Sequence, residues 1–182
     1  MKIEKCDIEG LLIIELDIFK DERGFFVEKF NEAKFIDLGI QHKFVQDNHS
    51  RSLPNVIRGL HMQINPSQGK LVSVAKGKIL DIAVDARPSS KTFGQYFTIE
   101  LSDINGKMLW IPAGFLHGFS VISESETDVL YKVNGLYNPA GEIGVKWNDP
   151  ELNINWLVSN PIVSSKDNNL GSFKEYKEKY GI

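Results

Sequence analysis

The sequence predicts an all-β fold, a double-sheet jelly roll with short peripheral helices near residues 31–38 and at the C-terminus. Apolar and polar residues alternate with a period of two over several short runs, which is the pattern of half-buried strands. Single glycines lie between or beside these runs. Many short strands at near-regular spacing are typical of a sandwich or barrel, and a jelly roll often encloses a pocket between its sheets.

The length of 182 residues predicts a single domain, residues 1–182, without repeats or a long linker. The net charge of −3 gives no general attraction to nucleic acid or to an anionic membrane. The longest apolar runs are far shorter than the ~20 residues of a membrane span. No signal-peptide pattern is present, and the only cysteine, Cys6, cannot form an internal disulfide. We therefore expect a cytoplasmic protein with neither a nucleic acid nor a membrane as partner.

The first expected strand covers residues 12–18, where Ile14, Leu16 and Ile18 alternate with two acidic residues. Further expected strands lie at residues 56–63, 70–75, 80–85, 96–101, 108–111, 119–122 and 129–133.

Helix signals are confined to regions near the two ends of the chain. Asn31 is a favourable N-cap for the helix expected at 31–38. Ser172 and Glu175 form a capping box before the last expected helix, which Gly181 would end.

Polar residues interrupt the apolar pattern in two neighbouring segments. Residues 46–52 are entirely polar, which is consistent with either an ordinary loop or a functional segment. In the next expected strand, Arg58 and His61 are three residues apart, so an ideal strand would place them on opposite faces. A β-bulge at Gly59 would bring both inward, and Gln63 shares a face with His61 in any case. A hydrogen-bonded core histidine is the alternative interpretation of His61.

Charged residues also occur within the later strands. Lys70 begins one strand, and Asp81 and Asp85 share a face of the next. Because carboxylates are seldom buried unpaired, the two are expected to pair with basic residues in one internal network, or, for Asp85, to face solvent. His117 lies beside a Pro/Gly turn among aromatic residues, and we expect it to face the pocket.

The segment around His117 resembles the second cupin motif, in which Gly is followed after five residues by Pro-x-Gly-x-x-His. The matching residues are Gly106, Pro112, Gly114 and His117. The resemblance implies a cupin-type double-stranded β-helix. A cupin metal site would use His-x-His, then Glu, then the histidine of the second motif. The corresponding positions hold His61, Gln63, Ser67 or Gln68, and His117. Because amides are poor ligands for transition metals, the sequence predicts no bound metal.

A metal-free pocket can still support proton transfer. A histidine can take a proton from carbon if a neighbouring carbonyl delocalises the carbanion and fixed donors meet its charge. Lys70, Arg58 or His117 could supply those donors. The chain has neither a P-loop nor a G-x-G-x-x-G motif after a strand, so no cofactor is expected.

Ordered motifs run along nearly the whole chain. They occupy residues 21–28, 44–50, 58–63, 68–72, 81–87, 111–119, 131–132, 137–139, 147–150 and 165–167. Together they are similar to the signatures of the dTDP-4-dehydrorhamnose 3,5-epimerase family. The resemblance implies a metal-free, homodimeric isomerase of dTDP-L-rhamnose biosynthesis. Its substrate would be a dTDP-4-keto-6-deoxyhexose, dTDP-4-dehydro-6-deoxy-D-glucose, epimerised at C3 and C5 to dTDP-4-dehydro-L-rhamnose.

The resemblance also implies roles for individual residues. By motif position, His61 is the proton acceptor and Asp167 orients it. Tyr131 returns a proton on the other face of the sugar, and Lys70 stabilises the enolate. The positions implied to bind substrate are Arg23, Phe26, Glu28, Gln46, Asn48, Arg58, His117, Tyr137, Glu142 and Lys166. Of these, Tyr137 would stack on thymine, and Phe26 and Glu28 would act within their own subunit or from the partner subunit.

Departures from the family pattern keep alternatives open. Met62 stands where an aromatic residue is usual, and Asn134 where threonine is common. A C3-only or C5-only epimerase and a 3,4-ketoisomerase of a related 4-keto sugar nucleotide are both compatible with the chain. A sugar-nucleotide-binding jelly roll without turnover is a hypothesis from another class, and so is a metal-dependent cupin enzyme.

Overall fold

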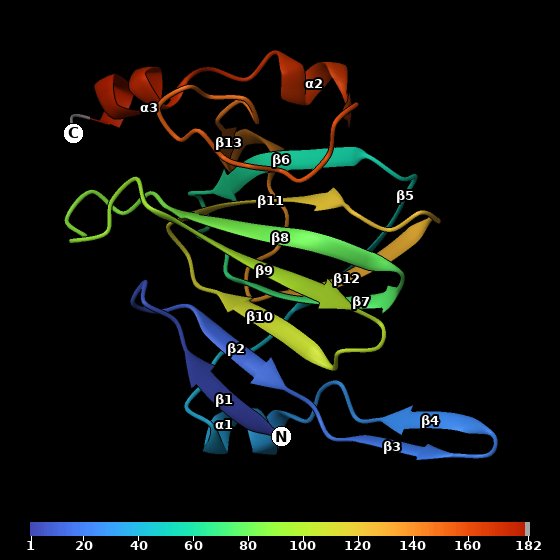
Figure 1. The fold of residues 1–182 in the computed structure, drawn as a ribbon. Helices are drawn as coiled ribbons and strands as arrows, with labels where there is room; N and C mark the ends of the chain where they lie inside the picture. Colours follow the sequence, from blue (N-terminus) through green and yellow to red (C-terminus); the bar gives the residue numbers. More distant parts are fainter. Residues whose placement is uncertain (181–182) are drawn as a thin grey trace.

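A computed structural model describes residues 1–180, and in these residues the chain forms two facing β-sheets (Figure 1). The first sheet has the order β1 (Lys2–Lys5), β2 (Leu12–Glu15), β10 (Lys107–Ile111), β7 (Lys70–Lys76), β12 (Thr127–Val133) and β5 (Gln46–Ser52). The second has the order β13 (Glu142–Gly144), β6 (Val56–Gln63), β11 (Phe115–Val121), β8 (Lys78–Asp85) and β9 (Tyr96–Ser102), and β14 (Ile162–Val163) pairs with β6. Successive strands from β5 to β8 and from β10 to β12 alternate between the two sheets, which confirms the predicted jelly roll.

The main core fills the space between the sheets with aliphatic side chains. Val72 and Val129 of the first sheet belong to the same buried cluster as Ala83 and Phe115 of the second. A second cluster lies on the outer face of the second sheet, where Leu116 packs with Trp156 and Phe173 of the C-terminal segment. Figure 1 shows this segment crossing over β6 and β13. Because both of its faces are covered, β8 is almost completely buried.

The expected first strand is divided into two. β2 ends at Glu15, and the chain then leaves the sheet, where the amino group of Met1 pairs with Asp17. It continues as a hairpin of β3 (Ile18–Asp21) and β4 (Gly24–Val27), which pair only with each other. The hairpin extends away from both sheets in Figure 1. The alternation at residues 12–18 indicated the strands but not this change of direction.

The described helices are short. In α1 (Glu32–Asp37), Asn31 accepts a hydrogen bond from the N–H of Lys34, as its predicted capping role requires. In α3 (Phe173–Tyr180), Ser172 and Glu175 each accept a hydrogen bond from the other's backbone N–H, which confirms the capping box. The expected end of this helix at Gly181 lies outside the described residues.

Two further helical elements were not predicted from the sequence. They are α2 (Ser165–Asn168) and a 3₁₀ turn, η1 (Pro139–Gly141).

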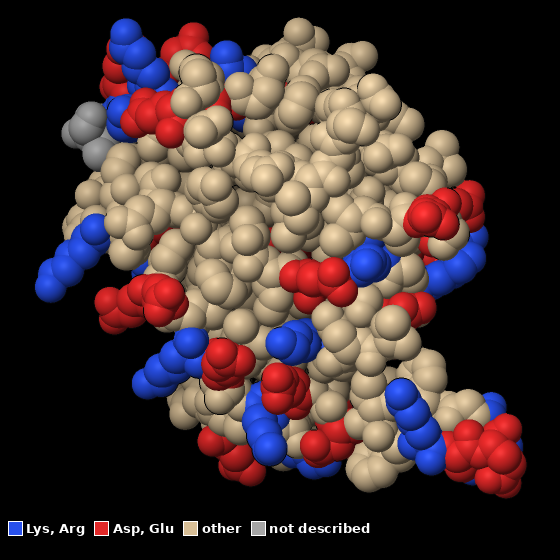
Figure 2. All heavy atoms as spheres, in the orientation of Figure 1, with Lys and Arg blue, Asp and Glu red and all other residues tan. Residues whose placement is uncertain are grey.

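The charged side chains on one face of the molecule show no separation by sign. On the face drawn in Figure 2, acidic and basic side chains are intermingled. Among residues 1–180, no helix has the length and apolar character needed to cross a membrane.

Candidate active site

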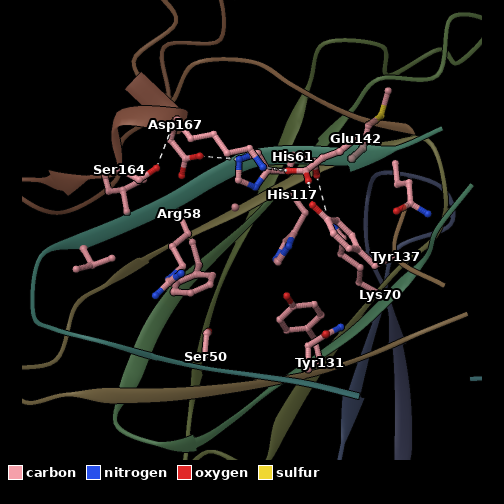
Figure 3. A pocket seen from close by; sticks show the side chains of 18 of the residues that line it. Ser50, Arg58, His61, Lys70, His117, Tyr131, Tyr137, Glu142, Ser164 and Asp167 are labelled. Carbon is pink, nitrogen blue, oxygen red and sulfur yellow. Dashed lines mark hydrogen bonds and ion pairs between the residues drawn. The ribbon is translucent and has the colours of Figure 1, made fainter. Parts of the chain in front are cut away.

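A cavity of about 680 Å³ opens between the two sheets. Its walls come from β5, β7 and β12 on one side and from β6, β11 and β13 on the other, and β14 and α2 close one edge. The predicted site residues that line it are Gln46, Asn48, Arg58, His61, Lys70, His117, Tyr131, Tyr137, Glu142, Lys166 and Asp167. Figure 3 shows several of these side chains converging on one space.

A β-bulge at Gly59 allows both Arg58 and His61 of β6 to line the cavity. In the pairing with β11, His61 lies opposite His117 and Arg58 lies opposite Phe119, so β6 carries one extra residue. Gly59 has a φ of +122°, and a Cβ there would lie 2.6 Å from the Cα of Gly118. Only glycine allows this approach. The predicted bulge is confirmed, and Arg58, His61 and Gln63 all line the cavity.

His61 is held by a buried carboxylate from the far end of the chain. The distance from His61 Nε2 to Asp167 Oδ1 is 2.8 Å, and the backbone N–H of Gly59 donates to Asp167 Oδ2 at 3.1 Å. Ser164, the N-cap of α2, accepts from the backbone N–H of Asp167 and so fixes the carboxylate's position. Burial alone would raise the pKa of Asp167, but the hydrogen bonds from His61 and Gly59 outweigh burial and lower it.

His117 forms a second imidazole–carboxylate pair. Its Nε2 lies 2.7 Å from Asp81 Oδ1, and Asp81 is fully buried. Burial lowers the pKa of His117, and the attraction of Asp81 only partly offsets this.

Asp85 does not join this pair, so the expected single network is wrong. It is also fully buried rather than solvated, because Arg87 pairs with it at 2.7 Å and Ser90 donates a further hydrogen bond.

Lys70 lies in the cavity wall beside the backbone of His61. Its Nζ donates to the backbone carbonyl of His61 at 3.1 Å. Burial lowers the pKa of Lys70 to about 8, although Asp81 and Glu142 act in the opposite direction. The cavity therefore holds a cation that titrates not far above neutral pH.

Tyr131 occupies the wall opposite His61. It projects from β12 in the first sheet, whereas His61 projects from β6 in the second. In Figure 3 the Tyr131 ring points into the cavity from the side that faces His61. Burial raises the pKa of Tyr131, so the phenol keeps its proton at neutral pH. A phenol and an imidazole thus face one space from two sides.

Hydrogen-bonded side chains span the mouth of the cavity. Glu142 accepts from the hydroxyl of Tyr137 at 2.7 Å and from Nζ of Lys166 at 2.6 Å. These two bonds outweigh burial and lower the pKa of Glu142. The backbone N–H of Tyr137 donates to Gln46, whose amide donates in turn to Asn48. The bonds connect α2 and β13 at one side of the mouth to β5 at the other.

Arg58 stands beside this network with its guanidinium held over β5. Its Nε donates to Ser52 Oγ at 2.9 Å and its Nη2 to the carbonyl of Arg51. The side chain remains exposed to solvent.

Some cavity residues were not identified from the sequence. They are Ser50, Val56, Ile57, Met62, Gly118, Phe119, Ile162, Val163 and Ser164. Ser50, Met62, Gly118 and Phe119 lie inside the family motifs, so the motifs located them without assigning a role. The segment 162–164 has no such signal, because it reaches the site only through the parallel pairing of β14 with β6.

The donors in the cavity do not fit a metal ion. His61 and His117 each direct Nε2 at a carboxylate, and the amide of Gln63 is hydrogen-bonded to the backbone. Within residues 1–180, no group of three or more His, Cys, Asp or Glu side chains is arranged to hold a metal.

Comparison with known proteins identifies the family of this chain. The model of the dTDP-4-dehydrorhamnose 3,5-epimerase family matches residues 5–175. This chain belongs to that family. The dTDP-4-dehydrorhamnose 3,5-epimerase of Shigella flexneri is 48% identical over 171 residues, which are 93% of this chain and 94% of the relative.

Solved epimerase structures share the fold. The dTDP-4-dehydrorhamnose 3,5-epimerase of Elizabethkingia anophelis NUHP1 superposes with a TM-score of 0.89 at 45% identity, covering 96% of this chain and 97% of that one. A dTDP-6-deoxy-D-glucose-3,5-epimerase of Legionella pneumophila, in complex with dTDP-4-keto-L-rhamnose, has a TM-score of 0.91 at 44% identity, covering 95% and 93%.

Three residues that the epimerase family resemblance assigned to substrate lie outside this cavity. Arg23, Phe26 and Glu28 lie on or just after the projecting hairpin, and none lines the cavity. Arg23 pairs with Asp21, and Phe26 is 68% exposed. None of the three reaches the cavity of its own subunit here, because the hairpin points away from the sheets, and their binding of substrate stays a prediction.

Proposed function

We propose that this protein epimerises dTDP-4-dehydro-6-deoxy-D-glucose at C3 and C5 and yields dTDP-4-dehydro-L-rhamnose, in dTDP-L-rhamnose biosynthesis. The observation that supports this best is the placement of His61 and Tyr131 on opposite walls of one cavity. Inversion needs a base on one face of the sugar ring and an acid on the other, because one group acting from one side restores the original configuration.

His61 is the base in this proposal. With Asp167 ionised, Nε2 keeps its proton and donates a hydrogen bond to the carboxylate, which leaves the lone pair on Nδ1. The 4-keto group of the substrate acidifies the hydrogens at C3 and C5. His61 removes each in turn, and Asp167 stabilises the imidazolium that forms.

The negative charge that develops on the 4-keto oxygen requires fixed donors. Lys70 is the group proposed to supply them, since its Nζ lies 3.1 Å from the backbone carbonyl of His61, whereas His117, whose Nε2 is bonded to Asp81, is proposed to lie close to the sugar. In a site with little water such donors are worth far more than in solution. Tyr131 then protonates the enolate on the opposite face and completes the inversion.

The mouth of the cavity is the proposed nucleotide site. Tyr137 offers a ring that is 53% exposed, which is suitable for stacking on thymine. Arg58 presents a guanidinium that fits a diphosphate, and Lys166 adds a second cation. Gln46, Asn48 and Glu142 complete the polar rim.

We further propose a homodimer in which the hairpin of each subunit reaches the partner subunit's cavity. The support is physical: a two-stranded hairpin is marginally stable alone, and this one exposes Phe19, Phe25 and Phe26. Arg23 and Glu28 would then bind substrate from the partner. A cytoplasmic location is also proposed, supported by the single Cys6, which has no internal disulfide partner.

The test is isotope exchange in deuterated water with the 4-keto sugar nucleotide as substrate. We expect deuterium at both C3 and C5 of the product. Label at one carbon would indicate a single-position epimerase, and a 3,4-ketoisomerase would be recognised by the position of its product's carbonyl. No label would exclude the enolate mechanism. Substitution His61→Ala separates an enzyme from a binding protein, because only the enzyme loses a reaction while still binding dTDP.

A further inference from the structure

Two glutamines of the cavity have no part in the proposed chemistry. Gln63 stands where a metal-binding cupin would have a ligand, and Gln68 is one of two residues, with Ser67, at a second such position. Gln63 is 4% exposed, and a buried amide must find partners for two N–H groups and one carbonyl oxygen. The identity of those partners indicates what the residue does.

Both glutamines bind the backbone of one loop. Gln63 Nε2 donates to the carbonyl of Leu136 at 3.0 Å, and Gln63 Oε1 accepts from the N–H of Asn138 at 2.8 Å. Gln68 Nε2 donates to the carbonyl of Gly135 at 2.7 Å. The other N–H of Gln63 donates to Pro66 and so ties the side chain to its own strand end.

These bonds lie on both sides of Tyr137 in the chain. Leu136 and Asn138 are its immediate neighbours, and both are held by Gln63. Tyr137 itself is fixed at its N–H by Gln46 and at its hydroxyl by Glu142. A ring that is more than half exposed therefore rests on a backbone with little freedom to move.

We infer that Gln63, assisted by Gln68, is a positioning residue that holds Tyr137 ready for the thymine ring. Because Tyr137 is proposed to bind thymine, this role depends on the proposed function. Pre-ordering the loop removes the entropy cost of fixing it when the nucleotide binds.

The chemistry of the side chain explains why a glutamine occupies this position. The loop presents one carbonyl and one N–H, and Pro66 presents another carbonyl. An amide meets all three with two donors and one acceptor. Ionised glutamate has no donor, and neutral histidine has a single donor, so either residue would leave a buried carbonyl unpaired. The position that would hold a metal in other cupins is used here to fix a loop.

The test uses Gln63→Met, which keeps the length of the side chain and removes its hydrogen bonds. Binding of dTDP is measured by titration calorimetry, and kcat is measured with the sugar nucleotide at saturation. We expect dTDP to bind about 10-fold more weakly, from the loss of two loop bonds of ordinary strength. The value of kcat should fall less than the affinity, because His61 and Tyr131 are not touched.

Asn105→Leu is the matched control. Asn105 also makes three hydrogen bonds to the backbone through its amide, to Glu100, Ser102 and Lys107, but in a turn outside the cavity. It should leave dTDP affinity unchanged even if the protein becomes less stable. Gln68→Met, which removes one bond, should weaken dTDP binding in the same direction by a smaller factor, and it provides the measurement if Gln63→Met does not fold.

A double-mutant cycle with Tyr137→Leu separates positioning from general structural damage. If Gln63 acts through the Tyr137 ring, Gln63→Met should cause little further loss of dTDP affinity in the Tyr137→Leu background. An equal loss in both backgrounds would overturn the inference, and so would normal dTDP binding by Gln63→Met. If the unaltered protein fails to bind dTDP at all, the proposed function itself is wrong.

Discussion

Replacing Asp167 by asparagine tests the proposed base most sharply. Asp167 is 4% exposed and accepts from His61 and from the N–H of Gly59 through separate oxygens. Asparagine keeps the shape but has one acceptor and one NH₂ group, so it cannot satisfy both donors. Either the bond to Gly59 is lost, or His61 changes tautomer and loses the lone pair on Nδ1.

The expected fall in kcat follows from the hydrogen bond between Asp167 and His61 that is lost. A buried, charge-assisted hydrogen bond contributes about 1.5–3 kcal/mol. The upper value applies here, because the imidazolium formed in the reaction would lose its counter-charge. Since 1.36 kcal/mol corresponds to a factor of ten in rate, kcat should fall about 100-fold.

The assay is the rate of deuterium incorporation at C3 and C5 at saturating substrate, with dTDP affinity measured in parallel. Asp128→Asn is the control, since Asp128 also pairs with a histidine, His49, but on β12 outside the cavity. Asp128→Asn should incorporate deuterium at the rate of the parent protein. A decrease of less than about threefold for Asp167→Asn would refute the assignment of Asp167 as the orienting carboxylate of the base.

Three further predictions concern charge and assembly. Burial lowers the pKa of Lys70 to about 8, and only its charged form can stabilise the enolate, so kcat/KM should fall as pH rises through about 8. Lys70→Gln should lower activity and abolish this decrease of kcat/KM with pH. Burial raises the pKa of Asp85, but Arg87 and neighbouring hydroxyls outweigh it and lower the pKa from 3.8 to about 2. Asp85 thus adds about 2 kcal/mol of stability above pH ~4, which is lost as pH falls toward about 2, so the denaturation midpoint of Asp85→Asn should depend less on acid than that of the parent. Inactive Arg23→Ala and His61→Ala subunits, mixed and allowed to exchange, should regain part of the activity if the hairpin serves the partner, whereas no recovery would place Arg23 in its own subunit's site.

The strands that cover the apolar core could be predicted from the sequence because their alternation is regular. β5 could not, since its inward residues Gln46, Asn48 and Ser50 line a polar cavity and break the apolar period. Where a strand faces ligand instead of core, hydrophobic periodicity no longer identifies it. The segment then reads as a loop until its pairing with β12 is seen.

Residue spacing also cannot join positions that meet only in the folded chain. Asp167 and His61 are 106 residues apart, and α2 is too short to give a helical period. Family motifs supplied this pair, whereas the bulge at Gly59 could be inferred locally from the three-residue spacing of Arg58 and His61. The Gln63 contacts with the loop around Tyr137 depend on tertiary structure and had no sequence signal beyond the departure from a metal-site pattern.

The most direct test of the two-sided mechanism is Tyr131→Phe, followed by both isotope exchange and product stereochemistry. With His61 intact, deuterium should still enter the substrate, while formation of the inverted sugar should fall by at least about 100-fold. Tyr176→Phe, which removes a buried hydroxyl bonded to the carbonyl of Ala86 away from the cavity, should keep both deuterium exchange and inversion at the parent rate. Inverted product at the parent rate from Tyr131→Phe would contradict the account.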